Sequence, residues 1–97
     1  MNEDNWVFYL KLSKELPESF FALDQHFKRY GKSLVPISLK TLLEQGRKSN
    51  SLHVVLVLQS VKDLKYYNKK VKKAVKMLMI SRRLHLYIAS SFSSVLD

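Results

Sequence analysis

The segment LHVVLVLQ, residues 52–59, constrains the fold of this chain more than any other stretch of it. Its apolar run from Val54 to Leu58 offers no polar face to solvent, and valine favours an extended backbone. A strand with two apolar faces must be covered on both sides, as in parallel sheets whose connecting helices lie on each face. We therefore predict a buried central strand with helices packed above and below it.

Strand-like and helical segments alternate along the rest of the chain. In the first helical segment Phe20, Leu23 and Phe27 recur at helical offsets, and Gly31 suits the position just past a helix end. Pro36 cannot donate to a sheet ladder, so it indicates an edge strand. The predicted order is β-α-β-α-β-α-β, with strands at 6–12, 34–37, 52–59 and 83–89 and helices at 17–30, 39–45 (ended by Gly46) and 60–80.

The strand expected at 83–89 alternates Leu84, Leu86 and Ile88 with His85 and Tyr87, which is typical of a partly exposed edge. Edges at the second and fourth strands give the order 2-1-3-4, the topology of flavodoxin-like and receiver-like sheets. Since 97 residues with 46% hydrophobic side chains suffice for one core, we predict a single domain, 1–97. The expected fold class is α/β, a small three-layer sandwich around a four-stranded, mostly parallel sheet.

The residues that enzymes of this topology commonly use are missing from the sequence. Phosphate-binding loops need glycines between a strand and a helix, whereas Gly31 and Gly46 fall at predicted helix ends. Receiver domains share the topology but need carboxylates at the strand ends, which here read LSK, ISLK, LQSVK and IASS. His26, His53 and His85 lack metal-ligand spacing, and there is no cysteine and no nucleophile motif. We predict a non-enzymatic protein with no catalytic residue, metal or cofactor.

The helix expected at 60–80 is strongly amphipathic. Ser60 and Asp63 form an S-x-x-D capping pattern at its start. One stripe at 3.6-residue spacing is apolar and comprises Leu64, Tyr67, Val71, Ala74, Val75 and Leu78. The opposite side is basic, and the polyanion-binding surface that we predict there comprises Lys65, Tyr66, Lys69, Lys70, Lys72, Lys73, Lys76, Arg82 and Arg83.

The excess positive charge is confined to the second half of the chain. Residues 1–46 carry six basic and six acidic side chains, whereas residues 47–97 carry eleven basic side chains against Asp63 and Asp97. A helix that is charged only for solubility usually mixes both signs, so this asymmetry favours an acidic partner over a merely solvated face. Lysine suits phosphate backbones without reading bases, so we expect mainly non-specific binding of nucleic acid, with Tyr66 available to stack on an unpaired base.

A second candidate site is the rim where the predicted strands end. A serine follows each strand, and the carboxyl ends of parallel strands share one edge, where helix amino termini attract anions. The possible anion-binding rim comprises Ser13, Lys14, Ser38, Lys40, Ser60, Lys62 and Ser90. The simpler interpretation, which we favour, is that these serines cap helices.

Other interpretations stay open. The chain is alternatively a regulatory protein-interaction domain, a receiver-like fold without phosphoacceptor chemistry, which docks an acidic protein or forms a homodimer through the edge strand 83–89. Basic amphipathic helices also lie on anionic lipid, but here the apolar stripe is needed to cover the sheet. No segment approaches the roughly 20 apolar residues of a membrane span, and no signal-peptide pattern is seen, so we expect a cytoplasmic protein without integral membrane association.

Overall fold

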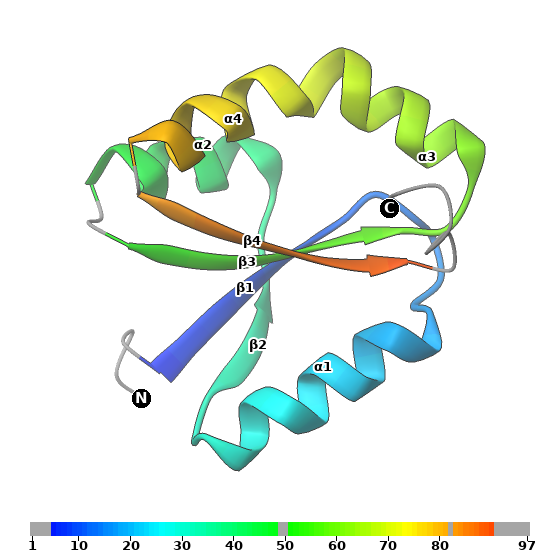
Figure 1. Cartoon of the computed structure of the whole chain (residues 1–97), viewed down its shortest axis with the longest axis vertical. Helices are drawn as coiled ribbons and strands as arrows, with labels where there is room; N and C mark the ends of the chain where they lie inside the picture. The colour runs from blue at the N-terminus through cyan, green and yellow to red at the C-terminus, as the bar shows by residue number, and fades with distance from the viewer. Residues whose placement is uncertain (1–4, 49–50, 82, 91–97) are drawn as a thin grey trace.

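Four parallel strands form the middle layer of the molecule (Figure 1). The computed structural model describes residues 5–48, 51–81 and 83–90. The strands are β1 (Trp6–Lys11), β2 (Ser33–Pro36), β3 (Leu52–Leu58) and β4 (Leu84–Ser90), and they lie in the order β2-β1-β3-β4. The predicted α/β fold class and strand order are confirmed.

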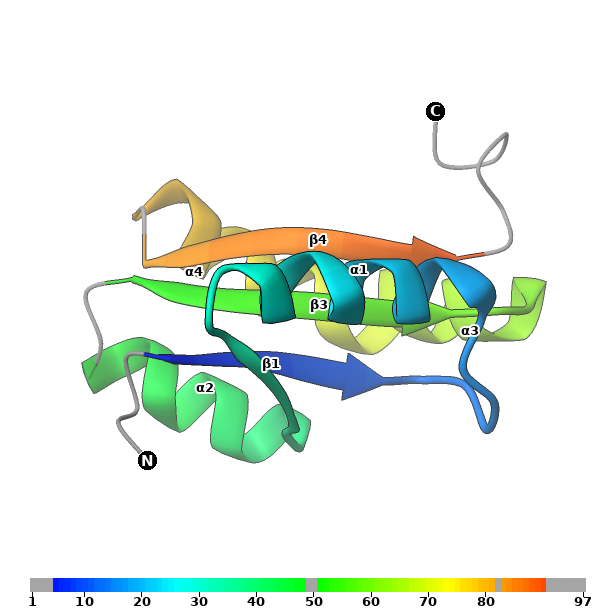
Figure 2. The ribbon, with the colours of Figure 1, turned by 90° about the horizontal axis from the view of Figure 1, so that it is seen from below.

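The connecting helices cover both faces of this sheet (Figures 1 and 2). Helix α1 (Glu18–Arg29) lies on one face, and the other face carries α2 (Leu39–Lys48) and the continuous run of α3 (Val61–Tyr66), η2 (Tyr67–Val71) and α4 (Lys72–Ile80). Right-handed crossovers account for this arrangement, because the connection from β1 to β2 crosses the sheet in the opposite direction to the other two. The boundary between β1 and β3 is therefore the topological switch point of the sheet.

Strand β3 is buried along almost its whole length, as its sequence predicts. Val54, Leu56 and Leu58 pack with residues of α2, η2 and α4 on one face, whereas Val55 and Val57 pack with α1 on the other. Strands β2 and β4 form the edges of the sheet. Each helix buries only the stripe that faces the sheet.

The helix ends use the local chemistry that the sequence indicates. Gly31 has a φ of 72°, and the N–H of Lys32 donates to the carbonyl of Phe27 at 3.0 Å, which closes α1 with a Schellman arrangement. At the start of α3 the Ser60 hydroxyl accepts from the N–H of Asp63 at 3.1 Å, and the Asp63 carboxylate accepts from the N–H of Ser60 at 3.0 Å. The predicted capping pattern is therefore a complete capping box.

Gly46 does not end a helix, and our prediction was wrong at this point. Helix α2 continues to Lys48, and Gly46 is buried within it. A Cβ atom added at Gly46 would lie 2.6 Å from a methyl carbon of Leu78 in α4. A side chain at this position would have to displace Leu78, because α2 and α4 approach each other closely here, a contact between segments that are far apart in the sequence.

We expect this close approach to couple positions 46 and 78 energetically. Gly46→Ala gains about 1 kcal/mol of helix propensity but overpacks against Leu78, which costs roughly 1–3 kcal/mol, so the net effect is destabilising. In a Leu78→Ala background the same substitution is expected to be stabilising. Urea denaturation of the four proteins in this cycle measures the coupling, and equal effects of Gly46→Ala in both backgrounds would contradict the packing argument.

The helix expected at 60–80 is present, but it is not α-helical throughout. The π-helical turn η2 separates α3 from α4 without interrupting the helix. The apolar stripe still faces the sheet, because Val71 and Val75 are buried and Tyr67 and Leu78 are half-buried. Turns of this type are frequent at functional sites, and this one carries Lys69 and Lys70.

Candidate functional site

The most basic surface of the described residues is the outer side of the α3–η2–α4 helix. The apolar stripe of this helix packs against the sheet, so the lysines on the other side of the helix point outward. On the inner side, burial raises the pKa of the Tyr67 phenol. We define the lysine face as the exposed residues Lys65, Lys69, Lys70, Lys72, Lys73 and Lys76.

The charge of the lysine face is not compensated by neighbouring acids. Within the described part of the chain, none of its six lysines takes part in an ion pair. The nearby carboxylate of Asp63 is engaged elsewhere, because it accepts hydrogen bonds from the N–H groups of Gln59 at 2.9 Å and Ser60 at 3.0 Å. Like charges gathered without counter-charges raise the local concentration of anionic ligands.

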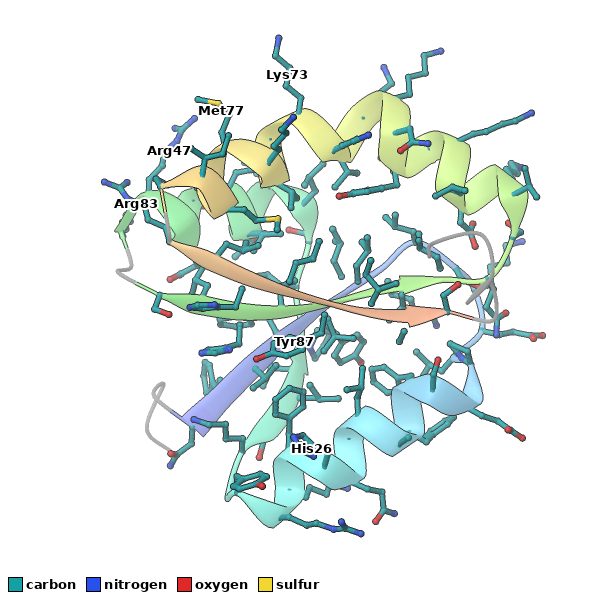
Figure 3. The ribbon with its side chains drawn as sticks, in the orientation of Figure 1. His26, Arg47, Lys73, Met77, Arg83 and Tyr87 are labelled. Carbon is teal, nitrogen blue, oxygen red and sulfur yellow. The ribbon has the colours of Figure 1, made fainter. Side chains whose placement is uncertain are left out.

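The structure brings further basic residues to this surface. Arg47 and Lys48 end α2, and the Arg83 guanidinium donates to the backbone carbonyl of Arg47 at 3.4 Å. Figure 3 shows Arg47, Arg83 and Lys73 on the same side of the molecule, the side that α2 and α4 form. The remaining predicted surface residue, Arg82, lies outside the described residues.

Sequence reasoning missed Arg47 as part of this surface. The prediction that α2 ends before Gly46 placed this residue in a loop of unknown direction. A signal was present, since basic residues favour the last turn of a helix, where they interact with the carbonyl end of its dipole. The proximity of Arg47 to Arg83, however, depends on how α2 packs against α4.

The predicted serine rim is only partly brought together. Ser13, Lys14, Ser60 and Lys62 line one cleft of about 450 Å³ at the switch point between β1 and β3. Ser38 lies in a neighbouring cavity that Lys62 also lines. Lys40 is exposed on α2, and the backbone carbonyl of Ser90 accepts a hydrogen bond from Ser19 at 3.3 Å.

The hydroxyl groups of this rim mostly make local hydrogen bonds. Ser38 accepts from the N–H of Thr41 at 3.2 Å and Ser60 accepts from Asp63, so both act as helix caps. The Ser13 hydroxyl donates to the side-chain oxygen of Gln59 at 3.3 Å and thereby links the loops that follow β1 and β3.

The electrostatics of the switch-point cleft do not favour an anion. Lys14 and Lys62 are balanced by Glu15 and Asp63 among the residues that line it. The Asp63 carboxylate also accepts hydrogen bonds from the backbone N–H groups of Gln59 and Ser60, which a bound phosphate would otherwise use.

Two histidines form a second titratable cluster on the α1 side of the sheet. His53 and His85 are partners in the register of β3 and β4, and their rings stack with centroids 4.7 Å apart. Nδ1 of His53 lies 3.1 Å from the Tyr87 hydroxyl. The pKa of His53 is lowered, mainly by partial burial and to a smaller extent by electrostatic repulsion from His85 and Lys32. No group of three potential metal ligands occurs among residues 5–48, 51–81 and 83–90.

The lowered pKa of His53 predicts a loss of stability in mild acid. The unfolded chain takes up this proton near pH 6.5, whereas the folded protein takes it up only at lower pH. The free energy of unfolding should therefore fall as the pH decreases below about 6.5, and this fall should be smaller in His53→Gln. Urea titrations of both proteins between pH 7.5 and 5 measure the difference, and identical pH profiles would disprove the assignment to His53.

The fold and this surface define a small three-layer α/β protein with an open parallel sheet and a basic outer helix. Comparison of the chain with protein-family models, curated proteins and solved structures finds no match. In the described ranges, no helix is both long enough and apolar enough to span a membrane.

Proposed function

We propose that this protein is a non-enzymatic module that binds nucleic acid through the lysine face, mainly without sequence specificity. The observation that carries the proposal is the lysine face itself: six exposed lysines on one side of one helix, without ion-pair partners in the described part of the chain. Lysine is a flexible point charge that suits phosphates, whereas base readout leans on the planar, bidentate groups of arginine, asparagine and glutamine.

The dimensions of the lysine face suit a phosphate backbone. From Lys65 to Lys76 the helix advances by roughly 16 Å at about 1.5 Å per residue. A duplex carries one charge per roughly 1.7 Å of its axis, so a surface of this length can contact several phosphates at once. Arg47 and Arg83 extend the same surface over the end of α2.

A fluorescence anisotropy titration with labelled oligonucleotides at about 50 and 200 mM salt tests this function. If the six lysines each contact a phosphate, affinity for a duplex should fall about a thousandfold over this range, because each contact releases counterions. Absence of binding at the lower salt concentration, or binding that does not respond to salt, would refute the proposal.

A second candidate function, the docking of an acidic protein partner in a regulatory role, is favoured by an apolar patch. Met77 and Ile80 of α4 are 66% and 69% exposed, and Figure 3 shows Met77 on the same side as Arg47 and Arg83. Apolar side chains bordered by cations suit a partner that combines acidic and apolar residues. This function predicts a discrete stoichiometric complex, and recovery of no protein partner in a pull-down together with a monomer in sedimentation would count against it.

Self-association is a variant of this second function. Strand β4 is an edge of the sheet, with Ile88 43% exposed, so the predicted homodimer would pair residues 83–89 with a second copy. The same sedimentation measurement tests it. A cytoplasmic location is part of both proposals, and cell fractionation tests it.

A further inference from the structure

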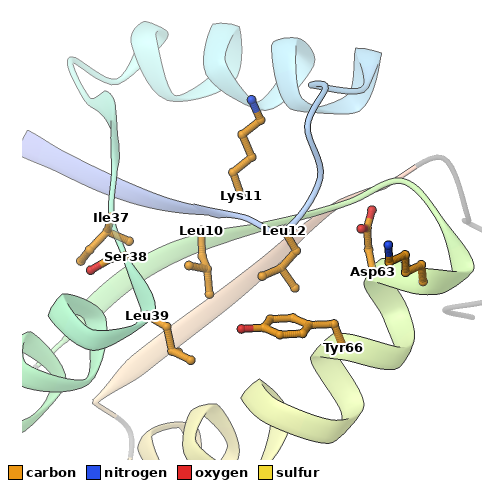
Figure 4. A pocket seen from close by; sticks show the side chains of 9 residues that line it. Leu10, Lys11, Leu12, Ile37, Ser38, Leu39, Asp63 and Tyr66 are labelled. Atoms are coloured by element: carbon orange, nitrogen blue, oxygen red, sulfur yellow. The ribbon is translucent and has the colours of Figure 1, made fainter.

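A cavity of about 440 Å³ opens at the carboxyl ends of β1 and β2, beside the first turns of α3 (Figure 4). Leu10, Leu12 and Leu39 provide an apolar floor, and the phenol ring of Tyr66 extends over it from α3. Tyr66 is 49% exposed, so its ring is not part of the core. The cavity lies at the edge of the sheet where ligands of open α/β sheets bind, and it adjoins the switch-point cleft, with which it shares Leu12, Lys62 and Asp63.

The shape and chemistry of this cavity suit a flat aromatic ligand. Such a ligand can contact the Tyr66 ring with one face and the leucine side chains with the other (Figure 4). Two polar groups that line the cavity are already engaged, because Ser38 is hydrogen-bonded to Thr41 and Asp63 caps its own helix. The cavity therefore offers stacking and apolar contact rather than a fixed hydrogen-bond pattern.

The cavity adjoins the lysine face along the helix. Lys62 lines the cavity with Tyr66, and Lys62, Tyr66 and Lys70 follow one another at four-residue intervals, which places them on one side of the helix. A chain of phosphates that follows the lysines would thus carry its bases past Tyr66. Stacking of bases on aromatic side chains beside a basic groove is the usual mode of single-strand binding.

We propose that this cavity takes one unstacked base of a single-stranded nucleic acid, with Tyr66 as the stacking residue. The proposal rests on the function proposed above and adds the class of nucleic acid. In a duplex the bases are paired and stacked, and extruding one costs free energy, so the protein should prefer single strands. Because every base has a π face, the cavity should accept any of them.

Three ligands of equal length test this inference by anisotropy at about 50 mM salt: a single strand, the same backbone with abasic sites, and a duplex. The wild-type protein should bind the single strand roughly tenfold more tightly than the abasic strand, the amount expected for one stacked base. In Tyr66→Leu, which keeps an apolar side chain, this preference should disappear. Tyr30→Leu is the control, because Tyr30 is an exposed tyrosine that follows α1 on the opposite face of the sheet.

Affinity of Tyr66→Leu for the abasic strand that equals the wild-type value separates a loss of stacking from a folding defect, and fluorescence gives a second readout of the stacking itself. The emission of a single 2-aminopurine in the strand should be quenched by the wild-type protein and by Tyr30→Leu, but not by Tyr66→Leu. Equal affinity of the wild-type protein for all three ligands, or quenching that survives Tyr66→Leu, would overturn the inference and leave the proposed function standing. Failure of all three ligands to bind would instead remove the proposed function, and this inference with it.

Discussion

A variant with Lys69→Gln, Lys72→Gln and Lys73→Gln is expected to bind nucleic acid about 100-fold or more weakly at about 50 mM salt. Each lysine that contacts a phosphate releases condensed counterions, so the slope of log affinity against log salt should also flatten by roughly 2.7. All three side chains are exposed, so their neutralisation should leave the fold intact. Anisotropy titrations of the variant and the wild-type protein over a salt series measure both quantities.

A control with the same change in net charge distinguishes local contacts from a general charge effect. Lys28→Gln, Arg29→Gln and Gln25→Glu also lower the net charge by three, but these residues lie on α1, on the other face of the sheet. This control should retain most of the affinity. If both triple variants lose affinity equally, only the overall charge matters and the lysine face is not the interface.

Leu56→Ala is expected to cost about 2–5 kcal/mol of the free energy of unfolding. Leu56 lies near the centre of β3 and is only 1% exposed, so truncation leaves a cavity that neighbouring side chains fill only in part. For a small domain this is a large part of a total stability of roughly 5–15 kcal/mol. Urea denaturation followed by circular dichroism measures the loss as a lower midpoint.

The neighbouring strand offers a matched control for this substitution. Ile88 of β4 is the register partner of Leu56, but it is 43% exposed because β4 is an edge strand. Ile88→Ala should therefore cost less than about 1 kcal/mol. Similar losses for both substitutions would mean that another segment packs against β4 in solution, for example the paired strand of a homodimer.

Much of the fold could be predicted because its causes are local in the sequence. The run from Val54 to Leu58 requires cover on two faces, and together with the alternation of strand-like and helical segments it indicates a parallel sheet between helices. Gly31 and the pair of Ser60 and Asp63 mark helix ends through bonds that span only a few residues. The strand order followed because Pro36 and the pattern of β4 indicated the two edges.

The candidate site was predicted less completely. The outward direction of the lysines followed from helical periodicity, and their exposure agrees with it. Seven residues predicted as an anion-binding rim divide in the structure between helix caps, one charge-balanced cleft and separate surface positions. Serine after a strand is compatible with a cap or with a ligand site, and only the positions of neighbouring side chains decide between them.

The sequence by itself determined the order of strands and helices, the buried strand and the amphipathic lysine helix. It also determined the concentration of charge in the second half of the chain. Each of these features depends on residues that are close together in the chain. Only the tertiary structure decided that Gly46 meets Leu78, that Arg83 lies beside Arg47, and that Tyr66 extends over a leucine floor. These contacts join residues that lie between roughly 30 and 55 positions apart. Their formation depends on how twisted layers pack, and periodicity within one segment carries no information about the distance to another.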